Sequence, residues 1–228
     1  MSDLPLQEKD FTKLERAAQF LRQAILQGDL KPGQKLKQQE LAEQLGMSAT
    51  PIREVLRVLE TEGLLIHVPY KGVFVAEVSP EDTEELTPIR AALEGLAVKL
   101  AVPRLKEDDI ENLERLAQEM ERAWQEMDMA QVRRCNYRFH AAIYRACGSQ
   151  TLCGMIDRLW PRFATDVLWM IPGRAERSIV QHRVLLDAIK NRDTTMAADL
   201  MTEHIATAGK AIVEFMKRQS SGGGTSSL

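Results

Sequence analysis

The stretch SATPIREVL, residues 48–56, decides the fold of the first third of the chain. Together with Leu59, which follows shortly after it, its large apolar residues fall at the i, i+3, i+4 and i+7 positions of one helical face: Ile52, Val55, Leu56 and Leu59. Thr50, Arg53 and Arg57 share the opposite face, and Ser48 is of a type that favours a helix start. The stretch therefore predicts an amphipathic helix that buries one face and presents hydrogen-bond donors on the other.

The segments on either side of this helix predict a winged helix-turn-helix. Apolar periodicity predicts helices from about Thr12 to Gln27 and from about Gln38 to Leu45, and residues 31–36, KPGQKL, are interpreted as a turn between them. After the central helix, LLIHV at 64–68 and VFVAEV at 73–78 are typical of two short strands around a turn. Three helices followed by a hairpin is the element order of that fold.

From Pro80 onward the chain carries only helical periodicity. Six segments with short polar or Gly/Pro joints show it: residues 81–102, 106–127, 130–147, 149–170, 174–191 and 193–219. Six helices with short connections predict an antiparallel bundle. The expected fold class is therefore mainly α, and its expected divisions are an N-terminal winged helix-turn-helix over residues 1–78, a C-terminal antiparallel α-helical bundle over 79–218 and a disordered tail over 219–228.

Composition narrows the class of protein. With 228 residues, 44% of them apolar and 28% charged, the chain is long enough for two globular domains. No segment reaches the roughly 18 consecutive apolar residues of a membrane span, and the N-terminus lacks a cationic and apolar signal, so we expect a cytoplasmic protein with no membrane partner. The three cysteines, Cys135, Cys147 and Cys153, lie in helical patterns without a CxxC, which favours buried thiols over disulfides or a thiolate metal site.

The first predicted domain has the features of a DNA-binding module. A helix can read DNA when its exposed donors reach base edges while nearby cations and amides hold phosphates. Arg53 and Arg57 alone could be a solvated helix face, but the hairpin that follows favours DNA binding. The formal net charge of -3 matters less than the local patch, because binding depends on where the cations lie. The predicted DNA-binding residues are Lys35, Lys37, Gln38, Gln39, Ser48, Thr50, Arg53, Arg57, Lys71 and Gly72.

These residues also carry a family resemblance. LAEQLGMSATPIREVLRVLETEGLL at 41–65, followed by YKGVFV at 70–75, resembles the N-terminal domain of the GntR family of bacterial transcription factors, over about Phe11 to Val78. The resemblance implies binding to double-stranded operator DNA. The family commonly has arginine at the positions of Ala49 and Gln39, so it implies no particular base preference for this chain.

Three histidines in the helical region face the predicted core. His140 lies one turn after Asn136 on an apolar face, while His182 and His204 each share a stripe with leucine, isoleucine or methionine. A lone inward histidine is usually a satisfied core residue. Three on different helices, with an inward asparagine, favour a divalent metal site with an open coordination position over a purely structural polar cluster. The predicted ligands are Asn136, His140, His182 and His204, and the predicted metal is zinc or nickel.

Arg90 is the fourth inward polar residue of interest. A buried guanidinium needs an anion, and two anions are possible here. Glu94, one turn later, would make a structural ion pair, whereas the carboxylate of a small ligand would make Arg90 an effector-binding residue. The sequence leaves both alternatives open.

The helical region resembles the FCD type of effector domain, found in the FadR-like branch of the GntR family. RAALE at 90–94, the pair Phe139 and His140 preceded by Asn136, and the two later histidines carry this resemblance over about Pro80 to Met216. It implies a metal and a cavity for small organic acids. Many relatives have aspartate where this chain has Asn136, which is a weaker, neutral ligand.

The combined hypothesis is a ligand-responsive transcription factor, not an enzyme. A homodimer would place two winged domains on a pseudo-palindromic operator, and a small carboxylate effector would shift the helical domain between two arrangements. Two alternatives compete with it. The histidines could form a metal-dependent hydrolase site, with Asp187 or Glu203 as a general base. Alternatively, the metal could be purely structural in a DNA-binding protein that senses no ligand.

Overall fold

The computed structural model describes residues 12–163 and 165–222 and divides the chain into two compact units. The first contains the residues up to Ile25 together with Leu30–Ala76, and the second contains Leu26–Asp29 and the chain from Glu77 onward. In the described residues, no helix combines the length and the apolar character that crossing a membrane requires. Each unit has its own hydrophobic core.

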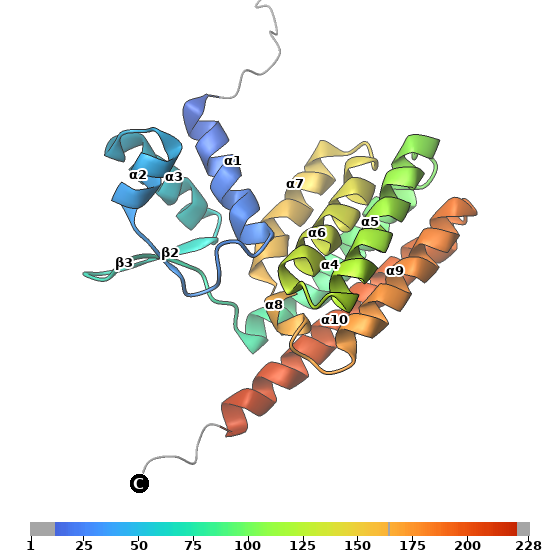
Figure 1. Cartoon of the computed structure of the whole chain (residues 1–228). Helices are drawn as coiled ribbons and strands as arrows, with labels where there is room; N and C mark the ends of the chain where they lie inside the picture. Colours follow the sequence, from blue (N-terminus) through green and yellow to red (C-terminus); the bar gives the residue numbers. More distant parts are fainter. Residues whose placement is uncertain (1–11, 164, 223–228) are drawn as a thin grey trace, which may run out of the picture. The chain divides into compact units, whose positions relative to one another are not determined.

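The first unit is a winged helix-turn-helix, which confirms the predicted fold class. Its elements are α1 (Lys13–Leu26), β1 (Lys35–Leu36), α2 (Gln38–Leu45), α3 (Ala49–Thr61), β2 (Leu65–Val68) and β3 (Gly72–Val75) (Figure 1). The predicted apolar face of α3 is buried, with Ile52, Val55 and Leu59 fully inaccessible to solvent. Burying this face leaves the polar face of α3, with Thr50, Arg53 and Arg57, exposed.

The sheet has three strands, whereas the sequence predicted two. β1 pairs antiparallel with β3, so the strand order is β1-β3-β2, and Leu36 lies opposite Val73. The interpretation of residues 31–36 as a turn was therefore wrong for Lys35 and Leu36, which form β1. A two-residue strand is too short to show the alternation that identifies strands, and only Leu36 of the pair is buried.

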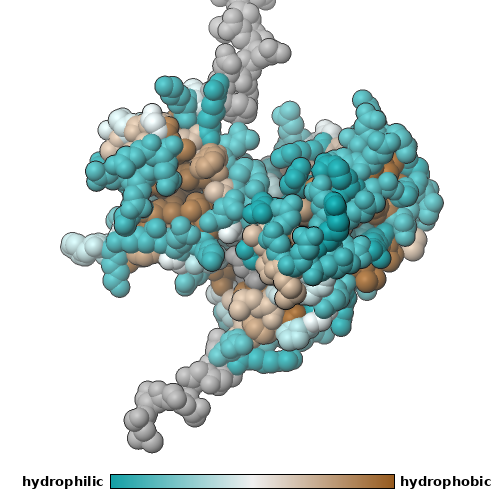
Figure 2. Space-filling view, viewed as in Figure 1, coloured by the Kyte–Doolittle hydropathy of each residue, from teal (hydrophilic) through white to brown (hydrophobic). Residues whose placement is uncertain are grey.

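The second unit is helical and contains α4 (Pro80–Ala101), α5 (Glu107–Gln125), α6 (Met129–Arg145), α7 (Gln150–Leu159), a 3₁₀ turn η1 (Trp160–Arg162), α8 (Thr165–Leu168), α9 (Arg174–Lys190) and α10 (Thr194–Gly222). Ser79 caps α4, because its hydroxyl accepts from the Asp82 amide and the Asp82 carboxylate accepts from the Ser79 amide. Hydrophilic residues cover most of the visible surface of this unit (Figure 2), and the apolar residues of its core lie between the helices.

Two boundaries in the second unit differ from the prediction. The segment 149–170, predicted as one helix, breaks into α7, η1 and α8, because Pro161 has no amide proton and its ring disrupts a continuing helix. The predicted tail begins too early, since α10 continues to Gly222 and residues 219–222 are helical. The rest of the tail, residues 223–228, lies outside the described residues.

Helices α4 and α10 run side by side and touch through glycine (Figure 1). A β-carbon at Gly209 would lie 2.8 Å from the β-carbon of Thr87, and nearer still to its hydroxyl. Thr87 cannot turn away freely, because it is β-branched and its hydroxyl donates to the carbonyl of Thr83 at 2.6 Å. The closeness of the two helices therefore depends on the absence of a side chain at Gly209.

We expect Gly209→Ala to lower the free energy of unfolding by about 1–3 kcal/mol, the usual cost of overpacking a core contact. The loss should appear in spite of alanine's higher helix propensity, which favours alanine over glycine by roughly 1 kcal/mol. Urea unfolding followed by circular dichroism measures it. Gly154→Ala in α7 is the matched control, because a β-carbon there meets no atom within 4 Å, and it should be neutral or stabilising. Equal stabilities of the two variants would contradict the close contact.

Candidate functional site

Helix α3 and the β-hairpin form an open groove of about 450 Å³ in the first unit. We call it the DNA-reading groove, after the predicted role of Arg53 and Arg57, and define it by its lining residues: Leu36, Gln38, Arg53, Leu56, Arg57, Glu60, His67, Gly72 and Val73. Four of the predicted DNA-binding residues thus line one surface: Gln38, Arg53, Arg57 and Gly72. The two arginines come from successive turns of α3 and are both exposed, so their guanidinium groups are available to base edges and phosphates.

The other predicted DNA-binding residues are not among those that line the groove: Lys35, Lys37, Gln39, Ser48, Thr50 and Lys71. All six are exposed. Ser48 occupies the N-cap position of α3, but its side chain makes no capping hydrogen bond. Instead, the Gln38 side chain donates to the Ala49 carbonyl at 2.5 Å and ties the start of α2 to the start of α3. The Lys37 ammonium pairs with the Glu40 carboxylate at 2.7 Å. This ion pair weakens the attraction of Lys37 for a phosphate.

His67 is a groove residue that the sequence analysis missed. It lies on β2 opposite Val73 of β3, and its side chain is exposed. The only signal in the sequence is its position in a predicted strand next to the wing, which does not distinguish it from any other exposed strand residue.

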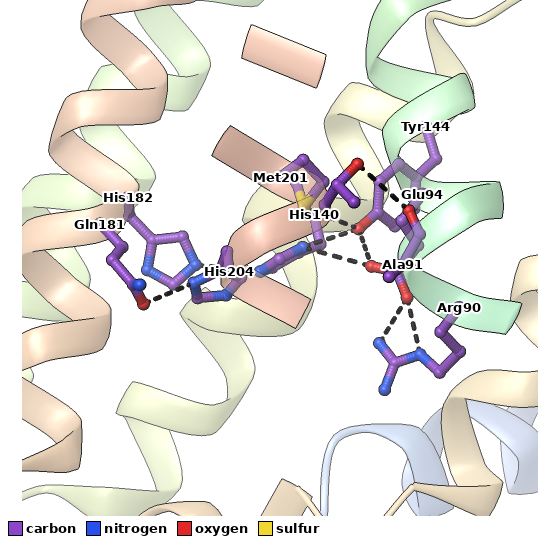
Figure 3. Close-up of polar contacts among 10 residues, drawn as sticks. Arg90, Ala91, Glu94, His140, Tyr144, Gln181, His182, Met201 and His204 are labelled. Carbon is purple, nitrogen blue, oxygen red and sulfur yellow. Dashed lines mark hydrogen bonds and ion pairs between the residues drawn. The ribbon is translucent and has the colours of Figure 1, made fainter. Parts of the chain in front are cut away.

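The three inward histidines of the second unit meet. His140 of α6, His182 of α9 and His204 of α10 each offer one ring nitrogen within 4.8 Å of the others, and all three are buried. We call them the histidine cluster (Figure 3). The His140 and His182 Nε2 atoms are 2.9 Å apart, and the His140 and His204 rings stack with centroids 5.2 Å apart. Three separate helices thus contribute imidazoles to one point, as the sequence pattern predicted.

A polar chain from α4 orients His140. The Arg90 Nε donates to Glu94 Oε1 at 2.6 Å, and the Tyr144 hydroxyl donates to Glu94 Oε2. His140 Nδ1 is 2.7 Å from the Tyr144 oxygen. Because that oxygen uses its proton toward Glu94, it accepts from His140, so the network places the His140 proton on Nδ1. The lone pair of His140 Nε2 then faces the histidine cluster.

His204 is oriented in the same way by a glutamine. Its Nδ1 lies 3.0 Å from Gln181 Oε1, which only accepts, so Nδ1 carries the proton and Nε2 carries the lone pair. The Nε2 atoms of His140 and His182 are hydrogen-bonded to each other. Because His140 carries its proton on Nδ1, its Nε2 accepts, and the proton between the two atoms belongs to His182. His182 Nδ1 is left buried without a hydrogen-bond partner. A cation at this point would replace the shared proton and let His182 carry its proton on Nδ1.

The surroundings keep the three imidazoles neutral. Burial lowers the pKa of His182 to about 3, with the positive charge of Arg174 as a second cause. Burial also lowers the pKa values of His140 and His204 well below the ordinary value, with further lowering by His182. Neutral imidazoles are the donor set of a zinc or nickel site: His140 and His204 direct lone pairs at the cluster, and His182 would do so once its proton moved from Nε2 to Nδ1. The residues present therefore fit a divalent metal ion.

Asn136 is the least supported member of the predicted ligand set. It is buried on α6, one turn before His140. Among the described residues, no hydrogen bond joins its side chain to the histidine cluster. Its role as a ligand stays a prediction.

Arg90 forms the structural ion pair with Glu94 and still has a donor for a ligand carboxylate. Its guanidinium pairs with Glu94 at 2.6 Å, and both side chains are almost completely buried. The guanidinium also lies over the rings of Trp160 and Phe163, with its carbon 4.6 and 4.2 Å from the ring centroids. The third nitrogen, Nη1, is buried without a hydrogen-bond partner. That nitrogen can still donate to an anionic ligand.

Comparisons with known proteins divide the chain in the same way. Residues 13–75 match the model described as bacterial regulatory proteins, gntR family, and residues 85–207 match the FCD domain. The HTH-type transcriptional regulator McbR of Escherichia coli is 34% identical over 194 residues, covering 82% of this chain and 88% of McbR. A probable D-xylose utilization operon transcriptional repressor of Paenarthrobacter nicotinovorans is 28% identical over 207 residues, covering 86% of each chain.

Solved structures show the same fold. The structure of E. coli McbR/YncC superposes with a TM-score of 0.79 at 31% sequence identity, covering 92% of this chain and 99% of that chain. A putative transcriptional regulator GntR from Rhodococcus sp. RHA1 gives a TM-score of 0.73 at 22% identity, covering 90% and 99%. At 22% identity, the similarity to the Rhodococcus structure concerns the fold alone.

Proposed function

The chain belongs to the GntR family of bacterial regulatory proteins, in the FadR-like branch with an FCD domain, and we propose that this DNA-binding regulator responds to a small organic acid. The observation that carries the proposal is the histidine cluster beside Arg90, a guanidinium with one unused donor. His140, His182 and His204 would hold zinc or nickel, with Asn136 as a further candidate. When bound, such an ion would act as a Lewis acid toward a carboxylate group.

The residues of the chain itself would orient the effector. Arg90 Nη1 would donate to the effector carboxylate, while Glu94 and the two aromatic rings hold the guanidinium in place. Tyr144 and Gln181 fix the His140 and His204 rings from behind. The site is thus arranged before the ligand arrives, which lowers the entropic cost of binding.

Helix α4 connects the proposed effector site to the winged helix-turn-helix through a short stretch of polypeptide. It carries Arg90 and Glu94, and only residues 76–79 separate its start from the end of β3. A displacement of α4 by the effector would therefore be passed to the wing. In a homodimer, such displacements would change how two DNA-reading grooves match the half-sites of a pseudo-palindromic operator. The coupling requires that the effector bind the two arrangements with different affinities.

The enzyme alternative is set aside by the family, which is one of transcriptional regulators. The candidate bases also lie in the wrong place, since the Asp187 and Glu203 side chains are both exposed while the histidine cluster is buried. Among the described residues, the one buried carboxylate is Glu94, and Arg90 and Tyr144 already engage it. A purely structural metal remains the alternative that experiment must separate.

We expect Arg53→Ala to weaken operator binding by about 10- to 100-fold, because a specific arginine contact contributes roughly 1–3 kcal/mol. Fluorescence anisotropy with DNA from upstream of the gene, measured across a salt series, gives the affinity. Arg16→Ala is the matched control, since Arg16 is an exposed arginine on α1 outside the DNA-reading groove. Equal losses in both variants would show nonspecific attraction only.

The response to ligand is tested on the same DNA. The zinc-loaded protein is titrated with short-chain carboxylic acids, and a tenfold or larger change in operator affinity is expected for the effector. If the acids bind the protein but saturating concentrations leave operator affinity unchanged, the proposed coupling is wrong. Chelation that melts the protein, together with no response to any acid, would instead favour the structural metal.

A further inference from the structure

Helix α9 carries a buried polar stripe that the proposed function does not use fully. Arg174, Ser178 and His182 occupy successive turns of one face and are 3%, 0% and 1% exposed. Each has a polar atom without a hydrogen-bond partner: Nε and Nη2 of Arg174, Oγ of Ser178 and Nδ1 of His182. Buried polar groups are normally paired, so three unpaired groups on successive turns are a candidate site for a polar ligand.

The stripe adjoins the histidine cluster. Arg174 Nη1 donates to Gln181 Oε1 at 3.1 Å, and the same oxygen lies 3.0 Å from His204 Nδ1. A single acceptor oxygen therefore separates the Arg174 guanidinium from the His204 ring.

The charge of Arg174 is not compensated. Arg90, the other deeply buried arginine in this region, is paired with Glu94. Arg174 forms no ion pair with any carboxylate in the part of the chain that the structure describes, and its one hydrogen-bond partner is the neutral Gln181. An unpaired buried charge is strongly unfavourable, so a bound anion beside Arg174 would stabilise the protein.

From this geometry we propose that Arg174 and Ser178 form a subsite for a second oxyanionic group of the effector, a carboxylate or a phosphate. The inference rests on the proposed function, in which the first carboxylate binds at the histidine cluster and Arg90. An acid with one anionic group would leave Arg174 unpaired, whereas an acid with two would satisfy it. Ser178 can donate its hydroxyl proton to the same group, and the start of α9 at Arg174 favours negative charge there.

The test compares acids that differ in one anionic group. Titration calorimetry on the full-length zinc-loaded protein measures malonate, succinate, glutarate and adipate, each against the monocarboxylate of the same carbon number. At least one diacid should bind about 10- to 100-fold more tightly than its monoacid, the range expected for hydrogen bonds to a charged group. 3-Phosphonopropionate against succinate distinguishes a phosphate from a carboxylate in the subsite.

Variants on α9 separate recognition from structure. Arg174→Gln and Ser178→Ala should each reduce the advantage of the diacid over its monoacid, with the larger loss for Arg174→Gln. The ligand-free Arg174→Gln protein should melt at an equal or higher temperature than the wild type, because an unpaired charge has been removed from the interior. A residue with only a structural role would lower the melting temperature instead. Arg177→Gln, at an exposed arginine of the same helix, is the matched control.

The outcomes distinguish this subsite from the function on which it rests. If monoacids and diacids bind equally, or if Arg174→Gln keeps the full diacid advantage, the subsite is wrong. The proposed function still stands in that case, provided that a monoacid binds and changes operator affinity. If no acid in the series binds, both the subsite and the organic-acid effector are overturned.

Discussion

Replacing Glu94 with alanine is expected to lower the free energy of unfolding by about 3–5 kcal/mol, the cost of breaking a buried ion pair from one side. The substitution leaves the Arg90 guanidinium inside the helical unit without its carboxylate, and it also removes the acceptor of the Tyr144 hydroxyl. Both partners of the pair are inaccessible to solvent, so water cannot replace the lost carboxylate. Urea unfolding of the metal-free protein measures the effect.

A surface pair with the same spacing provides the control. Glu214 and Arg218 also lie four residues apart on a helix, but their side chains are 50% and 80% exposed. Glu214→Ala should change stability by less than about 0.5 kcal/mol. Glu94→Gln should fall between the two, because an amide oxygen can still accept one hydrogen bond. A loss below about 1 kcal/mol for Glu94→Ala would mean that Arg90 finds another anion or reaches solvent.

Replacing His182 with alanine is expected to abolish stoichiometric metal binding. Two imidazoles would remain, and His140 Nε2 would lose the neighbour that lies 2.9 Å away. Elemental analysis after dialysis against zinc should give about one ion per wild-type chain and almost none in the variant. Zinc at roughly 1,000 times its dissociation constant should stabilise the wild type by about 4 kcal/mol relative to the chelated protein, and the variant not at all.

His67→Ala is the matched control for this prediction, since His67 is an exposed histidine on β2 of the other unit. It should keep both the metal and the stabilisation. Retention of one ion per chain by His182→Ala would show that the metal binds elsewhere. A wild-type protein that takes up no divalent ion would reduce the histidine cluster to a structural polar network.

Much of the fold could be predicted because its elements are long and amphipathic. The buried face of α3 and the helices around it follow from apolar spacing alone. β1 could not be predicted, since two residues show no period and its strand character depends on pairing with β3. The break at Pro161 has a local cause that the periodicity of residues 149–170 obscured.

The candidate site was only partly predictable. Inward histidines can be found because a polar residue interrupts an apolar stripe, and Arg90 was found in the same way. Tyr144 and Gln181 were missed, because their roles depend on which neighbouring helix they face. Arg174 was missed for another reason. An arginine at the first position of a helix is expected to reach solvent, and only the fold shows that this one is buried.

The hydrogen-bonded series Arg90, Glu94, Tyr144 and His140 would have a regulatory consequence under the proposed function. It joins the residue that would bind the acid to a residue that would hold the ion, so binding of either one would alter the surroundings of the other. Under the proposed function, the regulator would behave as a coincidence detector. A cell starved of the metal would leave the target genes in their default state even when the acid is abundant, so nutrient supply and metal supply would be read as one signal.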